Sequence, residues 1–419
     1  MLSIISLLID ILFFSLLTLV TDKRPAILSA IFILFFAICF SFDVMRSRQH
    51  KVIAKPLTAG LFFRVFLLFF DLYGREIYHL PNSGADSEVF YRSAVMRANG
   101  YHTYQENFVT LMSWFVRYLG DSRLFLQFIV VLFSIVTILF IDKSMVRLEL
   151  SGNTRRKVAW FLALLPNYAI LSSIFLRESI VAMFISIGLY FFVIWWIGGN
   201  ELSFWFAAAS CMCGSLFHSG AASVAVGIMA VRVFSNRRKQ TLHMSLRSVL
   251  PAVLFLFVFV YLYNNYTASM FGKMQAVESV EDIANTLEDG GSSYARFVGN
   301  SSNPVVMLLF TPLRMAFFQF SPFFFQIRGL KDIIAMVFDS FFYMYIFFAT
   351  LPYIRKKHLP YRTLIILFLV IGLAAAFVFG WGVSNTGTAL RHRNKLISIF
   401  ALQLALILES RQVFRRSQT

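Results

Sequence analysis

The stretch that decides the fold runs from Trp160 to Trp196, WFLALLPNYAILSSIFLRESIVAMFISIGLYFFVIWW, and only Arg177 and Glu178 in it carry charge. Crossing the hydrocarbon core of a membrane takes about 20 apolar residues in a helix, and such runs recur along the chain. The chain is 58% hydrophobic, and its runs are continuously apolar, unlike the alternating strands of a membrane β-barrel. The sequence therefore predicts an all-α, polytopic integral membrane protein.

Twelve membrane spans are predicted from the apolar runs, and 1–419 is predicted to be a single transmembrane domain. The spans are expected at 2–20, 25–42, 56–73, 124–141, 158–175, 179–197, 203–217, 220–234, 248–264, 330–352, 363–380 and 395–409. Pro304 to Gln326 is also apolar, but it contains Pro312, Arg314 and Pro322, and proline breaks the helical hydrogen-bond ladder. This segment is predicted to be a re-entrant or broken helix, and a single kinked span with a different topology is the alternative.

The loops between the predicted spans are of two kinds, which differ in their charged residues. The chain has 38 Lys and Arg against 21 Asp and Glu, a net charge of +17. Simple basic runs fill 43–55, 143–157, 235–247, 355–362 and the C-terminal tail, and such loops face the cytoplasm. Both termini are then cytoplasmic, and the large loops 74–123 and 265–303 lie outside, with 381–394. Because the cations are spread over short loops, anionic lipid headgroups and lipid-linked phosphates are the expected partners, and nucleic acid is not.

Arg177 and Glu178 interrupt the long apolar run, where each ionised group costs about 2.5–3.5 kcal/mol to insert. One interpretation is a local ion pair at the turn of a helix hairpin. The other is that Arg177 binds an anionic group of a substrate, while Glu178 orients it or acts as a base.

Two further outer positions carry candidate bases. His218 begins the turn His218-Ser219-Gly220 between two spans, and it is either an interfacial residue or a base that deprotonates a sugar hydroxyl. Asp86 precedes a predicted amphipathic helix that runs through Met96. It is either the N-cap of that helix or a carboxylate that activates or recognises an acceptor hydroxyl.

Arginines recur on the predicted outer face, where the positive-inside bias does not require them. The planar guanidinium fork suits phosphate oxygens, so a pyrophosphate is the expected ligand, with binding to ordinary headgroups as the alternative. The candidates for this role are Arg177, Arg296, Arg314, Arg391 and Arg393. No His, Asp, Glu or Cys spacing indicates a metal site, and no cofactor is expected.

At these residues the chain resembles the Wzy-type, EpsG-like family of polysaccharide repeat-unit polymerases. The matching elements are an early outer-loop Asp–Tyr element, a span that begins with a motif like Leu-Arg-Gln, and a later motif of His, Ser and a small residue. They correspond here to Asp86 with Tyr91, to Leu176-Arg177-Glu178 and to His218-Ser219-Gly220. Glu178 stands where Gln is usual, and the Asp–Tyr spacing is one residue longer. A large outer loop with an arginine and an arginine-bearing segment near the last spans complete the resemblance, which covers most of the chain in layout.

The resemblance implies a GT-C-like glycosyltransferase of the bacterial cytoplasmic (inner) membrane, with its active site facing the periplasm or cell exterior. Such an enzyme moves a growing glycan from undecaprenyl pyrophosphate onto a lipid-linked repeat unit of an O-antigen, capsule or exopolysaccharide. His218, Asp86 and Glu178 are then the candidate catalytic groups, and Tyr91 joins the arginines in binding substrate. Other proteins of the export pathway are implied partners. An O-antigen ligase, another polyprenyl-phosphate-dependent GT-C transferase, or a flippase for the same lipids are the alternatives.

Overall fold

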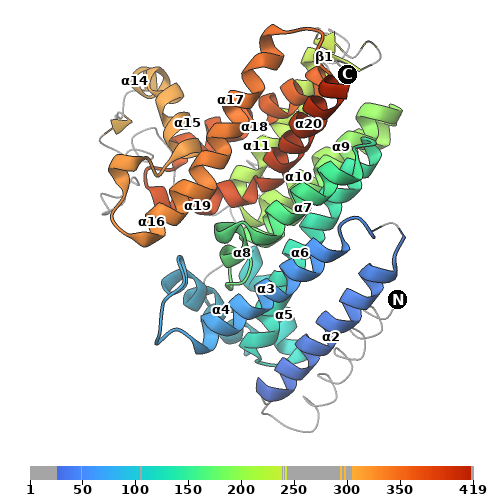
Figure 1. Ribbon diagram of the computed structural model, residues 1–419. Coiled ribbons are helices and arrows are strands. Elements are labelled where there is room, and N and C mark those ends of the chain that lie inside the picture. The colour runs from blue at the N-terminus through green and yellow to red at the C-terminus, as the bar shows by residue number, and fades with distance from the viewer. Residues whose placement is uncertain are drawn as a thin grey trace. The chain divides into compact units, whose positions relative to one another are not determined.

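The computed structural model describes residues 26–48, 50–103, 106–237, 239, 241–242, 293–294, 297–298 and 304–416. These residues form helices almost throughout (Figure 1), with one short antiparallel pair, β1 (Ser235–Asn236) and β2 (Thr241–Leu242). The chain divides into unit 1, residues 1–139 with 155–180, and unit 2, residues 140–154 with 181–419, and each is described by itself. The predicted spans 2–20 and 248–264 and most of the predicted loop 265–303 lie outside the described residues.

The prediction of an all-α membrane protein is confirmed. Seven helices of the described ranges are long and apolar enough to cross a membrane. They are Leu28–Arg46, Ala54–Tyr73, Arg123–Arg147, Glu178–Gly198, Leu330–Arg355, Arg362–Gly382 and Ile397–Arg416. Two further apolar helices, Glu201–Phe217 and Ser219–Phe234, are shorter. The protein is therefore a multi-pass membrane protein, while the count of twelve spans and the orientation stay predictions.

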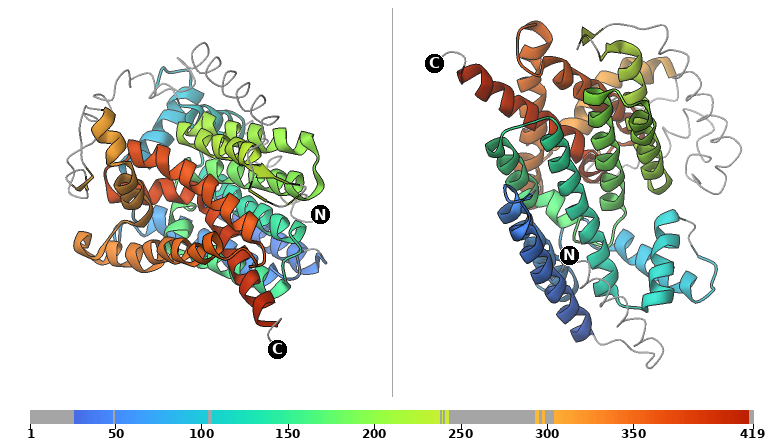
Figure 2. Two further views of the ribbon diagram at one scale, coloured as in Figure 1. Left: turned by 90° about the horizontal axis from the view of Figure 1, so that it is seen from above. Right: turned by 90° about the vertical axis from the view of Figure 1, so that its right-hand side faces the viewer.

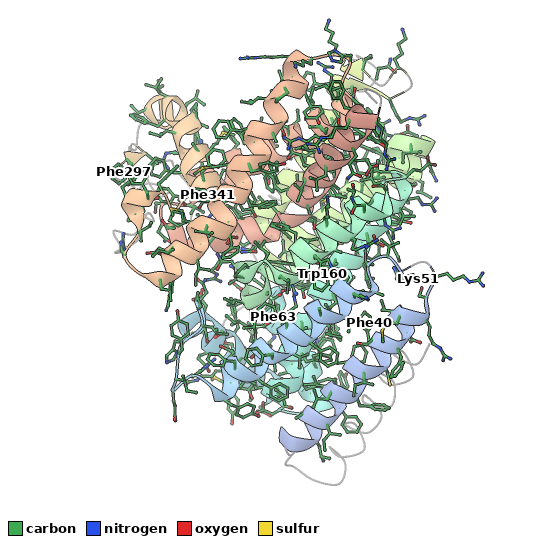
Figure 3. All side chains as sticks on the ribbon, viewed as in Figure 1. Phe40, Lys51, Phe63, Trp160, Phe297 and Phe341 are labelled. Carbon is green, nitrogen blue, oxygen red and sulfur yellow. The ribbon has the colours of Figure 1, made fainter. Side chains whose placement is uncertain are left out.

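The described part of unit 1 is built from helices. They are α2 (Ala26–Arg46), α3 (Ala54–Tyr73), α4 (Ala85–Ala98), α5 (Asn107–Leu119), the first part of α6 (Arg123–Arg147), most of α7 (Gly152–Leu164) and α8 (Pro166–Leu171). Helix α3 packs on both its neighbour α2, as Figure 1 shows, and the distant α8, and α4 packs on α5. In the connection between α2 and α3, the exposed Lys51 points away from the helices (Figure 3).

The predicted span 158–175 is not one helix. Pro166 lacks the N–H that would bond to the carbonyl of Leu162, so α7 ends at Leu164 and α8 starts at Pro166. The fully buried Arg64 of α3 replaces the missing donor, since its Nη2 bonds to the Leu162 oxygen and its Nη1 to the Ala163 oxygen, each at 3.0 Å. Its Nε also donates to Ser172 Oγ at 2.9 Å. Arg64 therefore makes the break stable inside the unit.

The predicted outer loop 74–123 contains two helices. The predicted helix through Met96 is present as α4, but it begins at Ala85 and so includes Asp86, which was predicted to precede it, and α5 was not predicted. Both bury an apolar face, and Phe90 of α4 meets Phe108 of α5 edge to face with ring centroids 5.7 Å apart. This segment is therefore a folded helical hairpin rather than an irregular connection.

Unit 2 centres on α18 (Arg362–Gly382). The other helices of the unit are most of α9 (Glu178–Gly198), α10 (Glu201–Phe217), the 3₁₀ turn η1 (Ser219–Ala221), α11 (Ala222–Phe234), α14 (Pro304–Leu309), α15 (Thr311–Phe320), the 3₁₀ turn η3 (Phe324–Gln326), α16 (Leu330–Ala335), the π turn η4 (Met336–Ser340), α17 (Phe341–Arg355), α19 (Thr386–Lys395) and α20 (Ile397–Arg416). Helices α11, α15, α17 and α20 all pack against α18, and α10 lies beside α11 in both views of Figure 2.

Glycine permits the closest of these approaches. A Cβ on Gly380 of α18 would lie 3.1 Å from the backbone nitrogen of Met315 in α15. A Cβ on Gly227 of α11 would lie 3.0 Å from the Cα of Ile371 in α18. Because small residues let helix backbones approach within a membrane, these two positions bring α11 and α15 directly onto α18.

The segment 304–326 is interrupted, as its prolines predict. Helix α14 ends at Leu309, and α15 begins at Thr311 with Pro312 in its first turn, where proline is tolerated. Helix α15 stops at Phe320, just before the cis peptide bond between Ser321 and Pro322. The segment is not among the helices long enough to span a membrane, and whether it is re-entrant stays a prediction.

Candidate functional site

A polar network ties the 74–123 hairpin to α3 and α6 in unit 1. The carboxylate of Glu88 on α4 accepts from Nη1 of Arg75 and from Nη1 of Arg123, the first residue of α6. Asp71 near the end of α3 accepts from Nη2 of Arg75 at 3.4 Å and from Nε2 of Gln127 at 2.9 Å. The network therefore fixes the hairpin to two membrane helices.

Hydrogen bonds between opposite charges keep Glu88 and Arg75 of this network ionised. Burial by itself raises the pKa of Glu88, but the hydrogen bonds from Arg123 and Arg75 outweigh it and lower the pKa to about 2. Burial likewise opposes the charge of Arg75, and the bonds to Glu88 and Asp71 nevertheless raise the pKa of that guanidinium. The charged forms of Glu88 and Arg75 stabilise each other at neutral pH.

The two residues of the predicted Asp–Tyr element lie in different environments. Asp86 is exposed in the first turn of α4, whose N-cap is Gly84, so Asp86 is not the N-cap. Tyr91 lies one turn further, and its hydroxyl donates to Asp121 while the guanidinium carbon of Arg123 lies 5.0 Å from its ring centroid. Burial and the bond to Asp121 raise the pKa of Tyr91, so its phenol stays protonated.

Arg177 is held by the hairpin. Its Nη1 lies 2.6 Å from Oε1 of Glu106, and its guanidinium carbon lies 5.6 Å from the ring centroid of Phe90. The ion pair therefore joins residues far apart in sequence, in contrast to the local pair considered for Arg177 and Glu178. Glu178 is buried as the first residue of α9, where the helix dipole favours a negative charge.

In unit 2, His218 lies within an aromatic cluster at the junction of α10, α18 and α19. Its ring centroid is 4.6 Å from that of His392 on α19 and 5.5 Å from that of Phe379 on α18. A Cβ on Gly220 would fall 2.5 Å from the Phe379 ring, so the His-Ser-Gly turn needs glycine here to let the ring approach. The turn thus positions His218 beside His392.

Lys395 orients His392 from one turn further along α19. Its Nζ lies 2.6 Å from Nδ1 of His392, and Lys395 is fully buried. An ammonium group only donates, so with Lys395 protonated Nδ1 of His392 is the acceptor and the ring proton sits on Nε2. Neither His392 nor Lys395 was among the predicted site residues.

Arg393 is fully buried and bonded to backbone. Its Nη1 donates to the carbonyl oxygen of Gln319 at 2.7 Å, and its Nη2 donates to that of Ser321. Its guanidinium carbon also lies 5.3 Å from the ring centroid of Tyr343. Arg391, two residues earlier on the same helix, is half-buried. Arg393 therefore satisfies backbone carbonyls at the C-terminal end of α15, and Arg391 is the more accessible of the two arginines.

The remaining predicted arginines are Arg314 and Arg296. Arg314 is fully buried on α15, with Tyr294 close enough to interact electrostatically with both Arg314 and Arg393. The backbone N–H of Tyr294 donates to the Ser384 carbonyl at 2.7 Å, which fastens the 293–294 segment to the start of α19. Arg296 lies outside the described residues.

An apolar cavity of about 260 Å³ lies beside this cluster, between α15, α17, α18 and α20. Pro312, Phe320, Phe347, Leu373 and Phe400 form part of its wall. Gln319 and Tyr343 line it too, and both contact Arg393. A hydrophobic space thus adjoins a buried cationic centre.

Two separate groups of predicted residues emerge. Unit 1 holds Asp86, Tyr91, Arg177 and Glu178, whereas unit 2 gathers His218, Arg314, Arg391 and Arg393 around α15, α18 and α19. Within the described ranges, no three His, Cys, Asp or Glu side chains are grouped so that they could hold a metal ion. Compared with known proteins, the chain matches no family model, no curated protein and no solved structure.

Proposed function

We propose that the protein is a polysaccharide polymerase, a membrane glycosyltransferase that moves a glycan from undecaprenyl pyrophosphate to a lipid-linked repeat unit. The observation that carries the proposal is the gathering, in unit 2, of two imidazoles, buried arginines and an apolar cavity. Each corresponds to one requirement of the reaction: a base, an anion site and a place for an isoprenoid chain. The motif resemblance supports the same reaction class.

The chemistry requires a base for the acceptor. In the proposed reaction an acceptor hydroxyl oxygen attacks the anomeric carbon of the donor sugar, and its proton passes to His218. The bond from that carbon to the pyrophosphate oxygen breaks, and the pyrophosphate leaves with the electron pair. A neutral imidazole suits this step because its ordinary pKa lies near physiological pH. The contact from Lys395 engages Nδ1 of His392 and leaves Nε2 as a proton donor, so His392 is proposed to donate a hydrogen bond to the substrate while His218 acts as the base.

The leaving group requires positive charge. Arg391 is the proposed phosphate ligand in unit 2, since it is half-buried and adjoins His392 on α19. Arg393 is proposed to hold the end of α15 in place, and buried Arg314 adds positive potential beside Tyr294. Fixed cations at the site of developing charge stabilise the transition state without reorganising during the reaction.

The donor lipid requires an apolar path. The cavity between α15, α17, α18 and α20 is proposed to take part of the undecaprenyl chain, with the pyrophosphate towards Gln319 and α19. We further propose that the protein acts in the bacterial cytoplasmic membrane with this site facing the periplasm or cell exterior, together with other proteins of the export pathway.

The test is the glycan profile of a deletion strain. Loss of polymer with retention of single-repeat product is the expected result, and complementation with the wild-type chain should restore polymer. Loss of all surface glycan would instead indicate a flippase, and accumulation of unattached polymer would indicate a ligase. His102→Ala serves as a matched control for histidine variants because His102 is exposed in the 74–123 hairpin of unit 1.

A further inference from the structure

A second cavity, of about 230 Å³, lies at the C-terminal ends of α17 and α20 in unit 2. It is lined by cationic side chains and contains no carboxylate among its lining residues in the described part of the chain. The cationic residues are Lys356, Arg411 and Arg415, and His358 lines the cavity too. Glu409, the acidic residue nearest in sequence, accepts from the backbone N–H of Ser151 at 3.1 Å and from its hydroxyl at 2.7 Å. The cavity is therefore strongly electropositive.

The cavity lies where membrane helices end. Helix α17 is the last part of the candidate span Leu330–Arg355, and α20 is the candidate span Ile397–Arg416. Pro352 and Phe414 supply apolar walls between the cations. Large apolar side chains close by in sequence are exposed: Leu351 by 37%, Ile354 by 48% and Val413 by 38%. A ligand with a charged head and an apolar body fits this boundary better than a free anion does.

The simpler account is that these cations only complete two helix ends and orient the chain. Lys356, Arg411 and Arg415 are exposed, but they line one cavity together rather than extending separately into solvent. Arg411 is also held in place, because its Nη1 donates to the hydroxyl of Tyr345 at 2.8 Å and its guanidinium carbon lies 5.5 Å from that ring centroid. One cation of the cavity is thus oriented in advance of any ligand.

We propose that this cavity binds the phosphate headgroup of an anionic membrane lipid. Lys356, Arg411 and Arg415 contact the phosphate oxygens, and the exposed apolar side chains beside the cavity contact the acyl chains. By the positive-inside rule this leaflet is the cytoplasmic one. The site is separate from the proposed glycosyl-transfer centre and does not depend on that activity.

Native mass spectrometry of the purified full chain tests the site with defined lipids. Phosphatidylglycerol is the anionic probe, phosphatidylcholine the neutral comparison, and inorganic phosphate and glycerol phosphate the free anions. The chain offers a matched control, because Lys357 and Arg416 are exposed neighbours that do not line the cavity. The variant Lys356→Gln with Arg415→Gln therefore has the same net charge as Lys357→Gln with Arg416→Gln.

We expect the cavity variant to bind phosphatidylglycerol about tenfold more weakly than wild type or the control variant, because it loses two charge-assisted contacts to the phosphate oxygens that the control variant keeps. Arg411→Gln alone should lower binding in the same direction, and thermal unfolding should show all variants folded. Equal weakening in both double variants would mean that overall charge alone attracts lipid, and the site would be rejected. Binding of inorganic phosphate as tight as that of phosphatidylglycerol would also overturn the lipid assignment.

Discussion

Nη1 of Arg393 donates to the carbonyl oxygen of Gln319 over 2.7 Å, so a residue of α19 closes the end of α15. The arrangement matches that of Arg64, which bonds to carbonyls left open by Pro166. In both places a buried guanidinium satisfies backbone oxygens at a helix break, which is needed because an unsatisfied buried polar group is costly away from water. Arg64 and Arg393 are thus both structural donors to backbone.

The Arg393 contact predicts a loss of stability on substitution. Arg393→Ala should leave the Gln319 and Ser321 carbonyls without their donor, at a cost of about 1–3 kcal/mol for each buried group left unsatisfied. Thermal unfolding of the purified protein in detergent measures this as a lower midpoint. Arg391→Ala, on the same helix but half-buried, should leave the midpoint near that of wild type. Similar midpoints for both variants would refute the structural role of Arg393.

The low pKa of Glu88 predicts an acid-sensitive hairpin. Because the folded-state pKa of about 2 lies below the ordinary value of 4.5, Glu88 contributes stability that is fully present above about pH 4.5. That contribution is lost as the pH falls towards 2. The wild-type unfolding midpoint should therefore drop more steeply over this range than that of Glu88→Gln, while Asp86→Asn, at an exposed site on the same helix, should follow wild type. Parallel pH profiles for wild type and Glu88→Gln would contradict the network.

Substitutions of Arg177 and of its partner Glu106 distinguish a structural role of Arg177 from a functional one. If Arg177 binds an anionic group of the substrate, as the sequence predicts, Arg177→Ala should abolish polymer at normal protein levels, and Arg177→Lys should rescue poorly because an ammonium lacks the bidentate fork. Glu106→Gln should then retain polymer. Equal losses of polymer and of protein in Arg177→Ala and Glu106→Gln would show that their 2.6 Å ion pair only holds the hairpin.

The two imidazoles are proposed to have different roles, His218 as the base and His392 as a hydrogen-bond donor. His218→Ala should lower turnover of purified lipid-linked repeat units by about 10²–10⁴-fold if His218 is the base. His218→Gln should not restore it, since an amide does not accept the proton. If His392 only donates a hydrogen bond from Nε2, His392→Ala should cause the smaller loss, and His392→Gln, whose amide still donates, should retain more activity than His218→Gln. Near-normal rates in both alanine variants would shift the role to Asp86 or Glu178.

Cysteine labelling in intact cells tests the predicted orientation of the protein in the membrane. Single cysteines placed at exposed positions of the 74–123 hairpin, such as Glu76 or Arg92, and at Gly382 should react with a membrane-impermeant maleimide from outside. A cysteine at the exposed Lys51, between α2 and α3, should react only after the cells are opened. The reverse pattern would invert the topology, and with it the assignment of the outer face.

Sequence alone determined the class of the protein and the places where its helices would be interrupted. A continuously apolar segment can satisfy its backbone N–H and C=O groups inside a membrane by forming a helix, and proline removes a backbone donor wherever it stands. The break before α15, the helix after Gly84 and the apolar character of α9 followed from these local rules. Tertiary structure decided the partners of each charge. Glu106 for Arg177 and Glu88 for Arg123 depend on which helix faces come together, and pairing at such distances in sequence leaves no local pattern. The lysine–histidine contact is the exception, since the two residues lie one turn apart on α19, and only the burial of that turn made it significant.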